Sequence, residues 1–341
     1  MANFCEVKPS LENYWRGIIL FGLNSASYKF ALAKSLLDLS EQNSAFVTLE
    51  ELAGPFSRHL VTHVSQGSKQ GTSRSNSVIE TCKKFIAGEL TDTALAEYVA
   101  KHGFNDVIDR FHIVNRNQTP IRFYHDERDG SKKGIRLTDE IYRLRELPCS
   151  ENFELEVEAR WRLVETAWEL KVSANLLTVR HDLDTERLFV DEESRRKDVT
   201  SCRDAMNGYQ KGKCFYCYDD ISVQTASPHM AEVDHFFPHL LKGQEGIYEP
   251  IDGVWNLVLA CSQCNGMSEK GTKVPTLKLL QRLNTRNEYL IASNHPLKET
   301  IINQTGNSSD ARGGFLNGIW NKSVQLLLFK WEPDAKGDST F

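Results

Sequence analysis

Two pairs of cysteines constrain this chain more than any other feature of its sequence. Each pair has the spacing C-x-x-C, and 43 residues separate the first pair from the second: Cys214, Cys217, Cys261 and Cys264. Two such pairs supply four soft thiolates, which is the ligand set of a closed tetrahedral zinc site. Because an ion bound there closes a long loop, we expect it to be structural and its removal to unfold this part of the chain.

Residues with oxygen and imidazole donors lie between and beside the cysteine pairs: Asp234, His235, Asn256 and Asn265. Carboxylate and amide oxygens suit Mg²⁺ and its bound water rather than zinc. His235 is the candidate general base, because an ordinary imidazole is largely neutral at pH 7 and can take a proton from water. A lone histidine is more often structural, but this one lies between two metal-binding pairs.

Asp234 and His235 are neighbours, so on a regular strand their side chains point to opposite faces. Both can serve one site only where the strand ends or twists. Pro238 follows three residues after His235 and predicts such an end.

The order C-x-x-C, D-H-x-x-P and N-L-V-L-A-C-x-x-C-N resembles the HNH endonucleases, also called ββα-metal nucleases, over roughly residues 210–275. In that family a two-stranded hairpin and a following helix hold one divalent cation against a scissile phosphate. The resemblance implies that Asp234 and Asn265 bind Mg²⁺ or Mn²⁺. It also implies that Asn256 braces the loop and orients the base, which an asparagine can do by bonding two backbone groups at once. For Asn265 the alternative is a helix cap.

One position departs from the family's pattern. Many members have a lysine three residues beyond the asparagine that follows the last cysteine, and Ser268 stands there in this chain. Lys270 or Lys273 is therefore the candidate phosphate contact. His229 and His239 are also near in sequence, either as hydrogen-bond partners of the site or as ordinary surface residues.

Apolar spacing divides the chain into five predicted parts. Helical periodicity dominates the first half, where we expect Trp161 and Trp168 to lie in a core. The parts are a helical accessory domain of unrecognised family at 1–172, a hairpin and connecting helix at 173–200, the nuclease core at 201–275, a basic helical extension at 276–331 and a flexible tail at 332–341. The predicted fold class is α+β: a mostly helical chain with a small ββα-metal, treble-clef-like zinc core.

Charge is spread unevenly along the chain. The formal net charge is −5, so no overall positive field attracts nucleic acid. Residues 276–331 nevertheless carry seven Lys/Arg against three Asp/Glu. Arg282 and Arg286, four residues apart on one helix face, are the candidate phosphate contacts, with affinity from counterion release. A solvated helix face is the alternative.

The first residues lack the basic and apolar regions of a secretory signal. The longest apolar run, residues 17–23, is far shorter than the roughly 20 residues of a membrane helix. We therefore expect a cytoplasmic protein with no membrane segment. In that reducing setting the four remaining cysteines are predicted to be ordinary, mostly buried thiols: Cys5, Cys82, Cys149 and Cys202.

The sequence predicts a metal-dependent DNA endonuclease, and we expect its setting to be bacterial restriction or phage defence. Its N-terminal helical region would bind the target or a defence-system partner protein. The alternative is a non-catalytic zinc module that binds nucleic acid or protein, but such a module has no need for the Asp, His and two Asn residues together. RNA stays open as a substrate, because no feature of the sequence reads a 2′-hydroxyl.

Overall fold

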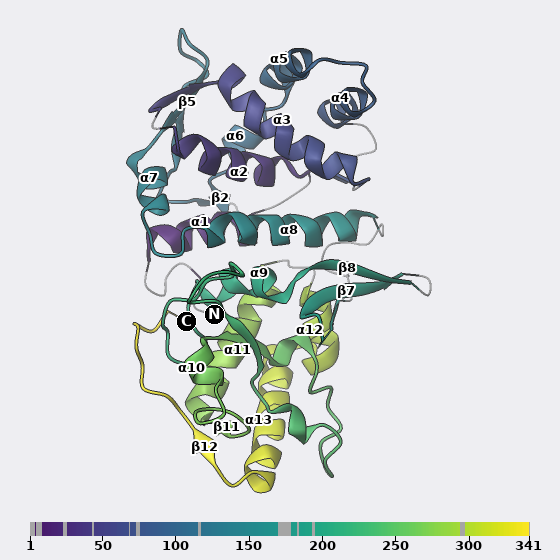
Figure 1. Cartoon of the computed structure of the whole chain (residues 1–341), viewed down its shortest axis with the longest axis vertical. Coiled ribbons are helices and arrows are strands. Elements are labelled where there is room, and N and C mark those ends of the chain that lie inside the picture. Colours follow the sequence, from purple (N-terminus) through teal and green to yellow (C-terminus); the bar gives the residue numbers. More distant parts are fainter. Residues whose placement is uncertain are drawn as a thin grey trace. The chain divides into compact units, whose positions relative to one another are not determined.

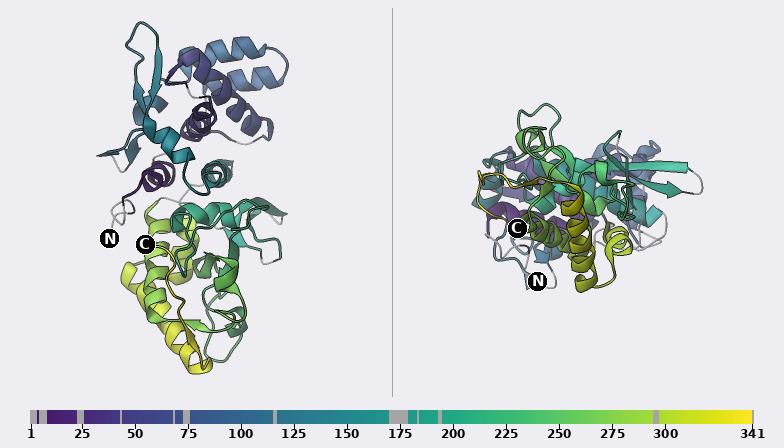
Figure 2. Two further views of the ribbon diagram at one scale, coloured as in Figure 1. Left: turned by 60° about the vertical axis from the view of Figure 1, so that its left-hand side comes forward. Right: turned by 90° about the horizontal axis from the view of Figure 1, so that it is seen from below.

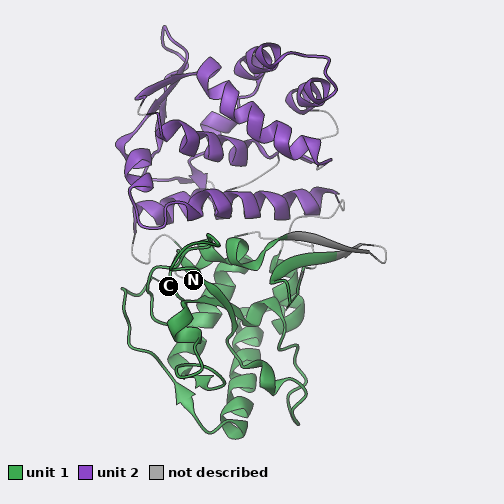
Figure 3. Ribbon diagram, in the orientation of Figure 1, with its two compact units in different colours: residues 1–8, 172–341 green, residues 9–171 purple. Residues whose placement is uncertain are grey.

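The computed structural model contains two compact units (Figures 1 and 3). The N-terminal unit comprises Pro9–Lys171, and the C-terminal unit comprises Val172–Phe341 together with Met1–Lys8. Both combine helices with small sheets, so the predicted α+β class is confirmed. The structure describes residues 4, 9–22, 26–42, 44–67, 69–72, 76–114, 117–169, 179–182, 184–192, 195–293 and 297–340.

The N-terminal unit packs its helices around one hydrophobic core, in which Trp161 and Trp168 are 0% and 5% exposed, as predicted. Its helices are α1 Leu11–Phe21, α2 Tyr28–Ser40, α3 Leu49–Ser65, α4 Ser77–Ile86, α5 Asp92–His102, α6 Val107–Arg110, α7 Asp139–Arg145 and α8 Asn152–Glu169. Its strands are β1 Phe46–Thr48, β2 Ile113–Val114, β3 Asn117–Gln118, β4 Tyr124–Asp126 and β5 Gly134–Leu137. They form a sheet of order β1-β5-β4 and a separate β2–β3 pair.

A polar network is buried inside the N-terminal unit. His63 of α3 lies between two carboxylates of α8: its Nδ1 is 2.6 Å from Glu165 and its Nε2 is 3.2 Å from Glu158. The imidazole stacks on the Trp161 ring with 3.6 Å between centroids. Trp161 in turn donates from Nε1 to the Gln70 amide oxygen at 3.0 Å. Both ring nitrogens of His63 therefore have partners, as buried polar groups require.

The C-terminal unit carries the cysteine pairs. Its strands are β6 Arg180–His181, β7 Arg187–Glu192, β8 Arg195–Ser201, β9 Glu232–His235, β10 Leu257–Ala260, β11 Val274–Pro275 and β12 Lys330–Trp331. Its helices are α9 Cys202–Asn207, α10 Ser262–Asn265, α11 Leu277–Ala292, α12 Leu297–Thr305 and α13 Ser309–Leu326. Strands β9 and β10 form an antiparallel hairpin in which His235 lies opposite Leu257, and one turn of helix, α10, follows directly.

The structure corrects the prediction for residues 173–200. Residues 173–178 lie outside the described part of the chain, but β6 and β7 pair as a hairpin. Instead of continuing into a connecting helix, residues 195–201 form a third strand, β8, and helix α9 begins only at Cys202. The strand forms because β7 offers a second edge of unpaired backbone groups, along which β8 pairs with one shift of register at Leu188 and Phe189.

Residues 332–340 of the predicted flexible tail are described by the structure and make contacts with the rest of the C-terminal unit. The backbone N–H groups of Lys336 and Gly337 donate to the Cys217 carbonyl oxygen at 2.8 and 3.1 Å. Glycine is needed at 337, because a Cβ there would lie 2.2 Å from the Tyr218 carbonyl oxygen. The tail therefore packs on the first cysteine pair.

Within the C-terminal unit, whose ribbon Figure 2 shows from two further directions, Lys211 contacts a residue from each end of the chain. Its Nζ donates to the Thr340 carbonyl oxygen at 2.6 Å and lies 4.7 Å from the centroid of the Phe4 ring. Phe4 also packs edge-on against Tyr289 of α11. The predicted accessory domain at 1–172 therefore differs from the observed N-terminal unit in its first eight residues.

Candidate functional site

The four cysteines of the two C-x-x-C pairs meet in space, as predicted. Their Sγ atoms all lie within 4.8 Å of one another, and the Cys217 and Cys261 sulfurs are 3.8 Å apart. A tetrahedral ion with Zn–S bonds of about 2.3 Å places its sulfurs about 3.8 Å apart. The spacing and the soft donors therefore fit one tetrahedral ion.

Hydrogen bonds from β10 hold the cysteine cluster on the hairpin. Phe215 N donates to Leu259 O at 2.9 Å, and Cys261 N donates to Cys214 Sγ at 3.3 Å. The first pair turns back on itself, because Tyr218 N donates to Cys214 O at 3.0 Å and Tyr218 has a positive φ of 63°. The cluster is therefore a staple on the β9–β10 hairpin.

The other cysteines that the structure describes lie apart from this cluster. Cys82 and Cys202 are buried, Cys149 is partly exposed, and Cys5 lies outside the described residues. Burial raises the pKa of Cys82 and of Cys202 to about 12, so both thiols stay protonated and unreactive.

His235 ends strand β9 with a nitrogen that lacks a partner. Its Nε2 is buried and makes no hydrogen bond within the described part of the chain. Burial is the main cause that lowers the pKa of His235, to about 4, against the opposing effect of Asp252. The ring is therefore neutral at pH 7. In the tautomer protonated at Nδ1, its free Nε2 can accept a proton.

Asn256 braces the turn that follows His235. Its Oδ1 accepts from Phe237 N at 2.8 Å, and its Nδ2 donates to Phe237 O at 3.0 Å and to Ile251 O at 2.8 Å. The side chain is completely buried. The bracing contacts expected for Asn256 are therefore present.

The contacts of Asp234 bear on its predicted role as a cation ligand, which stays a prediction. Its Oδ2 accepts from the Tyr216 hydroxyl at 2.5 Å, and its Oδ1 pairs with Lys270 Nζ at 3.0 Å. Burial, the largest cause, raises the pKa of Asp234, while the Lys270 charge lowers it in part. Both carboxylate oxygens have partners in the structure, so Asp234 would have to exchange one of them to bind a cation.

The same ion pair corrects the prediction for Lys270. This side chain is 1% exposed, and its Nζ also donates to the His235 carbonyl oxygen at 2.7 Å. It cannot reach a phosphate without leaving a buried carboxylate behind. Lys270 therefore positions the end of β9. Lys273 is partly exposed and donates to Ser268 O at 2.9 Å, so it remains accessible.

Asn265 pairs with a carboxylate that the sequence analysis missed. Its Nδ2 donates to Glu232 Oε2 at 2.7 Å, and both side chains are partly exposed. Glu232 lies two residues before Asp234, so the two carboxylates start on the same face of β9. That spacing was the available signal. Glu232 and Asn265 together offer a carboxylate and an amide, the hard donors that suit Mg²⁺.

Arg282 and Arg286 are corrections as well, because α11 turns both guanidinium groups inward. Arg282 is 9% exposed and donates to the carbonyl oxygens of Phe215 and Tyr216 at 2.6 and 2.7 Å. Arg286 is 0% exposed and donates to Trp255 O at 3.2 Å. Both arginines clamp backbone near the cysteines and the hairpin and are not available to phosphate.

His229 and His239, whose roles the sequence left open, are both exposed. His239 Nε2 lies 3.1 Å from Asp252 Oδ1, and its ring is 5.8 Å from that of His235. Asp252 also pairs with Lys242. His239 is therefore part of the surroundings of His235, through Asp252.

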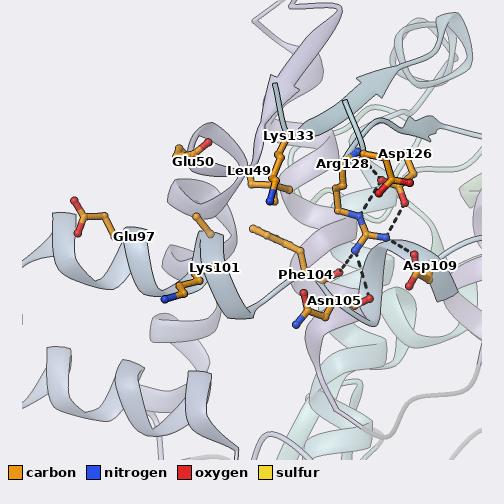
Figure 4. Close-up of a pocket in the computed structure, with 12 residues that line it drawn as sticks. Leu49, Glu50, Glu97, Lys101, Phe104, Asn105, Asp109, Asp126, Arg128 and Lys133 are labelled. Carbon is orange, nitrogen blue, oxygen red and sulfur yellow. Dashed lines mark hydrogen bonds and ion pairs between the residues drawn. The ribbon is translucent and has the colours of Figure 1, made fainter. Parts of the chain in front are cut away.

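A separate cavity of about 720 Å³ lies in the N-terminal unit (Figure 4). Figure 4 shows Arg128 pointing toward Asp109 and Asp126 at one side of it. Arg128 Nε donates to Asp126 at 2.8 Å, and another nitrogen donates to Phe104 O at 3.2 Å. The Arg128 charge is already matched, so we assign no chemistry to this cavity.

No family model matches this chain, and neither a curated protein nor a solved structure matches it. Among the described residues, no helix has both the length and the apolar character needed to cross a membrane. Function is therefore inferred from the geometry of the residues themselves.

Proposed function

We propose that this chain is a metal-dependent endonuclease of the HNH type that hydrolyses phosphodiester bonds in DNA. One observation carries the proposal: a neutral imidazole, His235, has an unpartnered nitrogen at the end of a hairpin stapled by four cysteines. A catalytic base needs such a free acceptor, whereas a structural histidine is satisfied by its neighbours. The hairpin followed by the short helix α10 also supports a ββα-metal core.

In this mechanism His235 Nε2 takes a proton from a water molecule as the water oxygen forms a bond to phosphorus. The bond from phosphorus to the leaving oxygen breaks, and that oxygen takes up a proton from solvent. Glu232 and Asn265 would hold one Mg²⁺ or Mn²⁺, which supplies positive charge beside the phosphate. Asn256 and Lys270 fix the backbone on either side of the imidazole.

The four cysteines would hold zinc as a structural ion. The four cysteines connect the turn at residues 214–218 to the end of β10. A metal bound there would therefore secure the hairpin that carries His235. We place the protein in the cytoplasm, in bacterial restriction or phage defence. The N-terminal unit then contacts the target or a partner protein.

A second candidate is a non-catalytic zinc module that binds nucleic acid or protein. The contacts of Asp234 favour it, because Tyr216 and Lys270 occupy a carboxylate that the family uses for its cation. RNA is a further possible substrate of the first candidate. The two candidates differ in one property, which is turnover.

Plasmid DNA, single-stranded DNA and RNA incubated with the purified chain separate the two candidates. The endonuclease cuts in Mg²⁺ or Mn²⁺, stops when these ions are withdrawn and resumes when they are restored. Zinc content is measured in parallel, so that loss of the structural ion is not mistaken for loss of the catalytic one. Binding without cleavage of any substrate in either metal would leave the zinc module as the function.

A further inference from the structure

A cleft of about 470 Å³ opens beside the turn that Asn256 braces. Its walls come from β6, from the loop before β10 and from α12, with the lining residues Val179, His181, Lys242, Ile251, Asp252 and Gln304. Asn256 donates both to Ile251 O in the cleft wall and to Phe237 O, two residues after His235. One buried side chain therefore ties the cleft to the candidate base.

Polar atoms without partners gather at this cleft. Within the described residues, both ring nitrogens of His181 and Oε1 of Gln304 are buried and make no hydrogen bond. His235 Nε2 is unpartnered in the same way. Leaving a buried polar atom unpaired costs free energy, so several of them around one hollow indicate a ligand that pairs them.

The other lining groups suggest the chemistry of that ligand. Val179, Pro250, Ile251 and Val254 give the cleft apolar surfaces. Apolar walls with a few polar groups at the edge are typical of small-ligand sites, and a nucleobase has such faces and edges. The Gln304 oxygen and the Asp252 carboxylate are acceptors, which suit the amino groups of bases.

The charge of this unit points to the same kind of ligand. Duplex binding depends on cations that displace counterions from phosphates. Lys270, Arg282 and Arg286 are all buried and bonded internally, so they cannot provide those contacts. Binding of a single strand combines cations with stacking of the bases, and Lys242 is an exposed lysine in the wall of the cleft.

We propose that this cleft receives one unpaired nucleotide next to the phosphate at His235, so that the substrate is single-stranded or locally unpaired nucleic acid. The inference rests on the proposed function for the position of the phosphate. A base in a regular duplex would have to leave its stack to enter, which costs free energy that an unpaired base does not pay.

Binding is measured without turnover, using the full chain with no Mg²⁺ or Mn²⁺ present. The probes are a fluorescein-labelled 12-nucleotide DNA strand, its blunt duplex and the same duplex with one bulged nucleotide. Fluorescence anisotropy should show the single strand and the bulged duplex binding about tenfold tighter than the blunt duplex. Equal affinities for the three probes would overturn the inference.

Two cleft variants, His181→Ala and Gln304→Ala, should each weaken binding of the single strand about tenfold and leave duplex binding unchanged. His229→Ala is the matched control, because His229 is an exposed histidine of the same unit. Zinc content and thermal unfolding show whether a variant is folded. If His181→Ala does not fold, Gln304→Ala provides the test. Single-strand binding at the parent level in both variants contradicts the inference.

The outcomes also separate the inference from the proposed function. Selective binding through the cleft with no cleavage of any substrate would retain the inference and reject the endonuclease. Cleavage of duplex and single strand at equal rates, unaffected by His181→Ala, would retain the endonuclease and reject the cleft.

Discussion

His63 is buried in its unit and His235 is partly exposed in its own, and the surroundings of the two imidazoles are opposite. His63 has a carboxylate on each ring nitrogen and a stacked indole on its face. His235 has a nitrogen with no partner among the described residues. An unpartnered buried nitrogen costs folding free energy, and such costs are expected at functional sites. The contrast therefore distinguishes a structural histidine from a candidate catalytic one.

The pKa directions of the two histidines follow from the same contrast. Burial lowers the pKa of His63, but hydrogen bonds and charge from Glu158 and Glu165 outweigh it, so the net shift is upward. At His235 burial prevails and lowers the pKa to about 4. The first imidazole is stabilised as a cation within an ion network. The second is held neutral at pH 7, and its Nε2 has no partner among the described residues.

The largest predicted effect is loss of the cysteine-bound ion. Cys264→Ser should remove zinc and unfold the C-terminal unit, because binding at a structural zinc site contributes on the order of 10 kcal/mol to folding. Differential scanning calorimetry and metal analysis of the full chain measure both. Cys149→Ser, which lies outside the cluster, should keep its zinc. An unchanged C-terminal transition in the metal-free Cys264→Ser chain would contradict the scaffold role.

The two carboxylates of β9 should respond differently to neutralisation. Asp234→Asn leaves the Lys270 charge buried without its partner, and should destabilise the chain by about 4 kcal/mol. Glu232→Gln should leave stability nearly unchanged but raise the Mg²⁺ concentration needed for cleavage about tenfold or more. Unfolding curves and metal titrations of the cleavage rate measure the two effects.

A compensating variant sharpens that pair. Replacing both members, Asp234→Asn with Lys270→Met, removes the unpaired charge and should recover part of the stability. If Glu232→Gln behaves as the parent while the stable double variant needs a higher Mg²⁺ concentration for cleavage, Asp234 is the cation ligand and the assignment to Glu232 is wrong.

A smaller effect is expected at Arg282. Arg282→Ala removes two charge-assisted hydrogen bonds to backbone carbonyl oxygens and should cost about 2 kcal/mol of stability. It should not change how steeply nucleic-acid affinity falls with salt, because the guanidinium does not face solvent. Chemical denaturation and binding at several salt concentrations test this. If the slope of log affinity against log salt concentration fell by about 1 in the variant, Arg282 would be a phosphate contact after all.

The smallest effect is on pH dependence. The folded pKa of His235 is about 4 and its ordinary value is about 6.5, so the unfolded chain takes up this proton first. Stability is therefore complete above pH 6.5 and falls as pH drops toward 4, by on the order of 1 kcal/mol after allowing for partial exposure. His235→Gln should reduce that loss between pH 7 and 5, in denaturation curves of the zinc-loaded chain.

The stability that His63 contributes changes with pH in the opposite direction to that of His235, so His63 serves as the comparison within the same chain. Its folded pKa is raised, so its contribution is complete below pH 6.5 and is lost as pH rises through the folded value. His63→Gln should remove this decline on the alkaline side. If both variants change stability in the same pH direction, the contrast between the two imidazoles does not hold.

Sequence spacing was enough to predict the cysteine cluster and the bracing contacts of Asn256. Two C-x-x-C pairs are a typical ligand set for zinc, and an asparagine in that order can bond several backbone groups. Apolar spacing likewise predicted the buried stripe of Trp161 and Trp168. Each of these depends on local pattern and residue chemistry.

The errors concern which charges are buried. Arg282 and Arg286 do share a helix face, but the sequence does not say that this face packs against the Tyr216 region and Trp255. Lys270 likewise has no local signal that it folds back onto Asp234, 36 residues away in sequence. Partners distant in sequence decide whether a cation meets solvent or a carboxylate. Tertiary packing therefore had to supply Glu232 and His181 as site residues.

The most direct test compares His235→Ala with His63→Ala in the zinc-loaded full chain, measuring cleavage rate and thermal midpoint on the same samples. We predict that His235→Ala lowers the rate about 10²- to 10⁴-fold with little change in midpoint. His63→Ala should lower the midpoint by several degrees while the folded protein cleaves at the parent rate. A folded His235→Ala variant that retains zinc and cleaves at the parent rate would contradict the account.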